Sequence, residues 1–171
     1  EPQGTGVIEN LMKRLLFLAL CGCSLPTLLM ADVVRLAPDI AWLNAAGKLK
    51  KITAFKGQPV VVIVARSPQD WTFRSQVGQL QKMYERLADK KIIFVAAFTK
   101  EPGRIKSNIP FVIAPDGPRV ANDFDITGKF GIAFIGRDRN LDYVTNKVVP
   151  AQRIYDIVGA SFVNQEKLRR P

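Results

Sequence analysis

The side chains best suited to redox, metal and acyl-transfer chemistry are scarce in this sequence. Its 171 residues include no histidine and two cysteines, Cys21 and Cys23, both near the N-terminus. Disulfide exchange needs a thiolate, structural zinc needs cysteine or histidine ligands, and the usual Ser or Cys triads need a base such as histidine. Once a leader ending at Ala31 is removed, the side chains that could take part in catalysis are carboxylates, Lys, Arg, Tyr, Ser and Thr. We therefore predict no catalytic residue, no metal and no cofactor.

A second set of candidate residues surrounds the predicted start of a helix near residue 70. In a structural interpretation, Asp70 stabilises the positive end of that helix and pairs with Arg74, four residues further on. In a functional one, Arg66 and Arg74 join the helix N-terminus to hold an anion. Trp71 and Thr72 are further candidate ligand contacts, although Trp71 equally suits a core or rim position.

The chain is strongly basic, with a formal net charge of +10. The excess lies after residue 31, because residues 1–31 hold two basic and two acidic side chains. Lysines cluster at two places: Lys48, Lys50, Lys51 and Lys56, and Lys90 with Lys91. Such a domain favours anionic partners, although solubility is the simpler account of any single lysine. We expect an unidentified protein partner or an anionic envelope component, and we recognise no nucleic-acid module.

Residues 12–31 have the order of a secretory signal. Met12 is followed by two basic residues and then by an apolar run over residues 15–20. Cleavage after Ala31 would release a periplasmic or secreted protein. A lipobox-like segment ending at Cys23 would instead give a lipidated membrane anchor. Both interpretations predict an exported protein.

The rest of the chain predicts one α/β domain over residues 32–163 and a polar tail over 164–171, with residues 1–11 lying upstream of the translation start. Short apolar runs alternate with a helical stripe, which is typical of a mixed β-sheet flanked by helices. We predict strands over 40–44, 49–55, 60–65, 92–98, 109–113, 131–136 and 141–147, and helices over 71–88, 119–124 and from 150 onward. The first two strands form an N-terminal β-hairpin.

This order of elements, with residues 55–84 and 114–138, resembles the thioredoxin superfamily, in particular exported thioredoxin-like proteins and peroxiredoxins. Aligned with the exported reductases, Asp70 and Phe73 fall where the two cysteines of C-x-x-C stand. Aligned with peroxiredoxins, Pro68 to Ser75 matches P-x-x-x-T-x-x-C, with Ser75 in place of the cysteine. The cis-proline of the superfamily is replaced at Phe130 or Gly131. In both alignments, the resemblance implies a vestigial active site without sulfur.

A further resemblance is to bacterial exported domains of unknown function that also occur in extracellular sushi-repeat matrix proteins. It is carried by the Ala-x-Ser-x-x-Asp run over residues 65–70 and by Phe-Ile-Gly-Arg-Asp over residues 134–138. It implies a redox-inactive binding or structural module of the cell envelope. The alternatives are a divergent oxidoreductase acting with a cysteine-bearing partner, and an envelope polyanion-binding protein.

Overall fold

A computed structural model describes residues 35–43, 48–55 and 57–169 of the chain, and their side chains as far as residue 160. The chain divides into two compact units, Glu1–Val33 and Val34–Pro171, and the first lies outside the described residues. The predictions for the upstream segment, the signal, Cys21, Cys23 and the cleavage site after Ala31 therefore fall outside them, as does Lys56. Within the described part, no helix is both long enough and apolar enough to cross a membrane.

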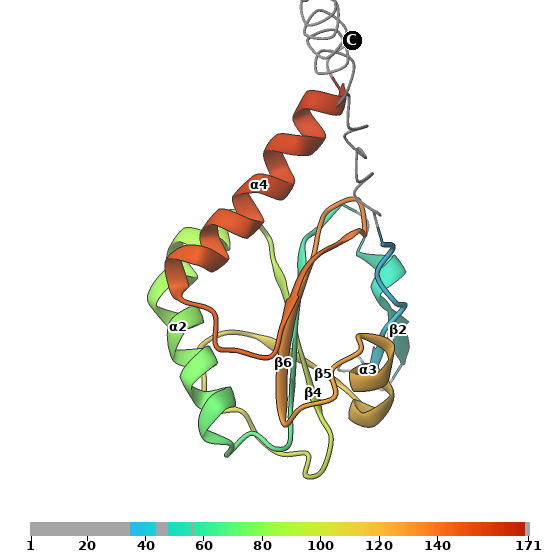
Figure 1. Cartoon of the computed structure of the whole chain (residues 1–171), viewed down its shortest axis with the longest axis vertical. Coiled ribbons are helices and arrows are strands. Elements are labelled where there is room, and N and C mark those ends of the chain that lie inside the picture. The colour runs from blue at the N-terminus through green and yellow to red at the C-terminus, as the bar shows by residue number, and fades with distance from the viewer. Residues whose placement is uncertain (1–34, 44–47, 56, 170–171) are drawn as a thin grey trace, which may run out of the picture. The chain divides into compact units, whose positions relative to one another are not determined.

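The domain is built on a five-stranded mixed sheet in the order β5-β4-β3-β6-β7 (Figure 1). The strands are β3 (Val60–Ala65), β4 (Ile93–Phe98), β5 (Phe111–Ala114), β6 (Phe130–Ile135) and β7 (Leu141–Thr145). Strands β3, β4 and β5 pair in parallel, and β6 and β7 are antiparallel to their neighbours. The predicted βαβ unit and the C-terminal strand pair are confirmed.

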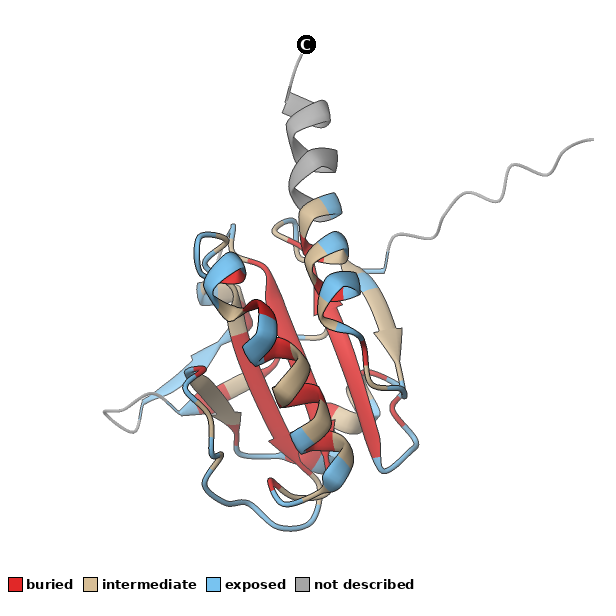
Figure 2. Ribbon diagram, turned by 90° about the vertical axis from the view of Figure 1, so that its left-hand side faces the viewer, coloured by how far each residue is buried: buried red, intermediate tan, exposed pale blue. Residues whose placement is uncertain are grey.

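Helices and a small hairpin cover the two faces of the sheet. One face carries α2 (Trp71–Ala88) and α4 (Ala151–Arg169), and the other carries α3 (Gly117–Asp123) and the antiparallel pair β1 (Ala41–Leu43) and β2 (Leu49–Lys51) (Figure 1). Figure 2 shows the resulting pattern, with buried strands at the centre and helices whose outer sides are exposed. The predicted α/β fold class, a mixed sheet flanked by helices with an N-terminal hairpin, is confirmed.

Strand β3 shows why an unbroken apolar run belongs at the centre of such a sheet. Its six residues are all buried, because alternate side chains enter different cores. Val61, Ile63 and Ala65 pack beneath α2 and α4, whereas Val60, Val62 and Val64 pack beneath α3 and the hairpin. A strand covered on both faces needs no polar alternation.

Helix α2 occupies the predicted residues 71–88 because a cap and an apolar stripe both favour it there. The Asp70 side chain accepts a hydrogen bond from the Thr72 N–H at 2.9 Å, a common way to begin a helix. Phe73, Val77 and Leu80 then face the sheet, with Met83 and Leu87 continuing the stripe.

One polar side chain of α2, that of Gln76, is buried, although its polarity predicts a position on the surface. Gln76 lies outside the apolar stripe of the sequence, yet its exposure is 0%. Its amide accepts a 2.7 Å hydrogen bond from the Val149 N–H and donates one of 3.1 Å to the Val149 carbonyl. The nearby Gln79 oxygen accepts from the Ala151 N–H at 3.2 Å. Two glutamines of α2 thus fix the start of α4.

Other element ends differ modestly from the prediction. Strand β2 stops at Lys51, because residues Ile52–Ala54 form a 3-10 turn that brings Phe55 onto Trp42, with ring centroids 4.4 Å apart. Helix α3 begins two residues early, at Gly117, where the Asp116 carboxylate accepts from the Arg119 N–H. Helix α4 continues to Arg169, through much of the segment predicted as a polar tail.

Candidate functional site

The first turn of α2 lies at the carboxyl end of the central strand β3, an edge where open α/β sheets place ligands. Residues 66–70 make a tight connection, in which the Asp70 N–H donates to the Ser67 carbonyl at 3.2 Å. The Asp70 carbonyl in turn accepts from the Arg74 N–H at 3.0 Å. The Asp70 carboxylate accepts a hydrogen bond from the Thr72 N–H. The negative charge at this end of the helix therefore comes from a side chain of the protein and not from a bound anion.

The positions predicted to be vestigial hold structural side chains. Phe73 is 1% exposed and packs edge-on against Phe98, with ring centroids 5.2 Å apart. Phe130 is buried and pairs with Ala65 across β3 and β6. Ser75 lies half-buried on the first turns of α2 and makes no side-chain hydrogen bond to a base among the described residues. None of these groups is arranged as an activated nucleophile.

The predicted contact residues separate into two sets. Arg74 is exposed and lines a pocket beside α2, but Arg66, Trp71 and Thr72 do not line that pocket. Trp71 projects into solvent with 71% of its surface exposed, so the expectation of a core position is wrong. Arg66 is half-buried, and its carbonyl accepts from the Lys100 and Glu101 N–H groups at 3.1 and 3.0 Å. The structure therefore places Arg74 and Arg66 in different surroundings.

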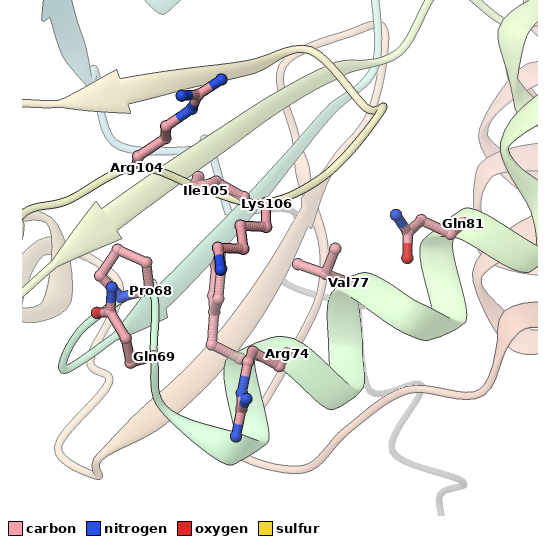
Figure 3. A pocket seen from close by; sticks show the side chains of 9 residues that line it. Pro68, Gln69, Arg74, Val77, Gln81, Arg104, Ile105 and Lys106 are labelled. Carbon is pink, nitrogen blue, oxygen red and sulfur yellow. The ribbon is translucent and has the colours of Figure 1, made fainter.

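This pocket, which we name the α2 pocket, has a volume of about 260 Å³ and lies between α2, the 67–70 connection and the loop before β5 (Figure 3). Its lining residues are Pro68, Gln69, Phe73, Arg74, Val77, Gln81, Arg104, Ile105 and Lys106. In Figure 3, Lys106 extends from the loop towards the first turn of α2, whereas Arg104 points away from that helix.

The outer wall of the α2 pocket is a loop with several anchors. Ile109 is buried in the core beneath α2, and Ile105 packs against the same core. The Gln81 amide donates to Asn108 Oδ1 at 3.2 Å, tying the loop to the helix. At the other end, a Cβ added to Gly103 would lie 3.2 Å from Pro68 Cγ, so loop and connection are in close contact. These contacts hold the loop in place as the outer wall of the pocket.

The α2 pocket is electropositive. Arg74, Arg104 and Lys106 line it together with apolar and amide side chains, and its lining includes no carboxylate. Within the part of the chain that the structure describes, none of these three cations has an ion pair or side-chain hydrogen bond. Guanidinium and ammonium groups donate to carboxylates and phosphates. The arrangement can hold an anion, but it offers no nucleophile and no base.

No group of three or more His, Cys, Asp or Glu side chains gathers among the described residues in a way that would hold a metal ion.

Most of this pocket escapes prediction from the sequence. Arg104 and Lys106 follow Pro102 and Gly103 in a stretch to which the sequence assigns no element. Ile105 packs against the core, and the two cations beside it in the sequence are exposed and line the pocket. No feature of the sequence indicates that Gln81 holds the loop to the helix.

Comparison with known proteins identifies the fold of the described domain. No family model matches the chain, and no curated protein is significantly similar to it in sequence. Among solved structures, a thiol:disulfide interchange protein of Chlorobium tepidum has a TM-score of 0.61 at 17% identity, covering 75% of this chain and 96% of its own. The mitochondrial 2-Cys peroxiredoxin of Plasmodium falciparum gives 0.59 at 13% identity, covering 81% and 99%.

An exposed lipoprotein thioredoxin of Streptococcus pneumoniae is also similar, with a TM-score of 0.56 at 12% identity over 72% of this chain and 99% of its own. These solved structures share one architecture with the described domain. The chain therefore has a thioredoxin-like fold. At such low identity the likeness establishes the fold alone.

Proposed function

We propose that this domain is an exported, redox-inactive thioredoxin-fold module with a binding or structural role in the cell envelope. The observation that carries the proposal is the first turn of α2, where the resemblance to redox relatives assigns the catalytic thiols. This chain has Asp70, Phe73 and Ser75 there, serving as a helix cap, a core residue and a half-buried helix residue.

The physical argument concerns the nucleophile. A helix N-terminus lowers the pKa of a thiol, so that a thiolate forms near neutral pH. A serine hydroxyl is far too basic for the same help to suffice, and the Ser75 side chain makes no hydrogen bond to a base among the described residues. Asp70 further places a negative charge at the helix end, which opposes the formation of any second anion there.

Export is supported by the leader and agrees with the nature of some structural neighbours. Residues 12–31 have the order of a secretory signal, and one neighbour is an exposed lipoprotein thioredoxin. We accordingly propose a periplasmic or secreted protein, or one held at the membrane through a lipidated Cys23.

The proposal predicts no catalysed thiol or peroxide chemistry. The protein, as processed and secreted by an expressing host, should reduce insulin in the presence of dithiothreitol no faster than the blank. It should likewise not accelerate peroxide consumption. A thioredoxin and a peroxiredoxin at equal concentration serve as positive controls. Turnover above the blank in either assay would refute redox inactivity and favour a divergent oxidoreductase.

A further inference from the structure

We infer that the α2 pocket binds a small organic anion, with an oxyanion head such as a carboxylate or phosphate on an apolar body. This inference rests on the proposed binding function and assigns it a site and a ligand class. The site differs from the predicted cradle of Arg66, Arg74 and the helix N-terminus, because Arg66 does not line the pocket and Asp70 caps the helix.

The charge of the pocket is the first argument. Three cations from two separate segments, α2 and the loop before β5, line one small cavity with no carboxylate among them. Surface cations are usually interspersed with acids, as at Lys51 and Asp39, whose nitrogen and oxygen lie 3.4 Å apart. Arg74, Arg104 and Lys106 have no such partner among the described residues. The donors of Arg74 and Lys106 are therefore available to a ligand, whereas Arg104, which points away from α2 (Figure 3), adds positive charge at the edge of the pocket.

The wall of the pocket is the second argument. Phe73 and Val77 are buried and form its helix side, and Ile105 and Pro68 add further apolar surface. Gln69 and Gln81 supply neutral amides. An apolar wall beneath a cationic rim matches a ligand with one charged end and one hydrocarbon end. At about 260 Å³ the cavity is smaller than most ligand sites, which measure about 300–1,000 Å³, so it suits only a small molecule.

The preformed state of the pocket is the third argument. Its loop is held by the buried Ile109, by the Gln81 to Asn108 hydrogen bond and by the contact of Gly103 with Pro68. Binding would therefore order few additional groups, which limits its entropic cost.

The test is isothermal titration calorimetry of the secreted protein with octanoate at low ionic strength. Saturable binding with one site is expected. Octanol lacks the charge and acetate lacks the hydrocarbon, so both should bind at least about tenfold more weakly. Raising the salt concentration should weaken the binding of octanoate, because salt screens the exposed cations.

The decisive variant combines Arg74→Gln with Lys106→Gln, which removes two charges and leaves the pocket wall intact. Octanoate affinity should fall about tenfold, given that each exposed charge pair contributes modestly. Lys82→Gln is the control for the loss of a charge from α2, because Lys82 is exposed on the same helix outside the pocket. It should bind octanoate like the parent.

A second arm separates a free anion from a lipid head group. Vesicles of phosphatidylcholine with and without phosphatidylglycerol replace octanoate, using the same variants. An affinity about tenfold lower in the double variant but unchanged in Lys82→Gln, in either arm, supports the inference and identifies the source. Equal binding by the parent and the double variant wherever binding occurs, or no binding in either arm, overturns it. The insulin and peroxide assays are independent of these results, so the redox proposal can fail or stand separately.

Discussion

Replacing Gly117 by alanine should destabilise the domain by about 3 kcal/mol and lower its midpoint of thermal unfolding by roughly 10 °C. Gly117 is the first residue of α3 and sits directly on the end of β4. A Cβ at this position would overlap the carbonyl group of Phe98 and lie 2.8 Å from its nitrogen. Backbone in the sheet cannot move aside as a flexible side chain would, so α3 must shift.

Urea unfolding of Gly117→Ala against the parent measures this effect. Gly78→Ala is the matched control, because Gly78 is inside α2 and a Cβ there would meet nothing within 4 Å. That control should be stabilised by about 0.5–1 kcal/mol, since alanine is the better helix former. If Gly117→Ala unfolded at the same urea concentration as the parent, the claim that α3 packs closely on β4 would be contradicted.

Replacing Gln76 by leucine should cost about 3 kcal/mol although the side chain keeps a similar size. Gln76 is fully buried and satisfies both backbone groups of Val149, which is itself 3% exposed. Leucine would leave that N–H and carbonyl buried without partners, and each carries a desolvation penalty. The start of α4 should loosen first, because its attachment to α2 depends on this pair.

The effect is measured by urea unfolding combined with amide hydrogen exchange at residues 149 and 151–154. Gln152→Leu provides the same chemical change at an exposed position of α4 and should alter stability by no more than about 0.5 kcal/mol. Equal stability of Gln76→Leu and Gln152→Leu would mean that the hydrogen bonds of Gln76 contribute nothing.

The sheet and the long helix can be predicted because their signals are local. The β-branched run over residues 60–65 favours a doubly covered strand, and Asp70 followed by an apolar stripe favours a helix from Trp71. The burial of Gln76 cannot be predicted in this way, because its partner lies 73 positions away along the chain. A polar residue bonded to a distant backbone has the same local sequence as one that faces water.

The candidate site is only partly predictable for a related reason. Arg74 follows from the position of the helix start, and the structure places it in the lining of the pocket. Arg104 and Lys106 reach the same pocket only because Ile105 and Ile109 pack their loop against the core of α2. That packing depends on the tertiary structure, so no spacing in the sequence predicts it.

Redox inactivity depends most on the absence of a thiol from the working protein, since Cys21 and Cys23 are the only cysteines in the chain. Intact mass of the protein recovered from an expressing host, before and after treatment with a thiol-alkylating reagent, tests this directly. We predict a polypeptide beginning at Asp32, or one whose Cys23 carries lipid, with no mass gained on alkylation. A mature form that retains an alkylatable cysteine whose disulfide forms and breaks reversibly would contradict the proposed inactivity.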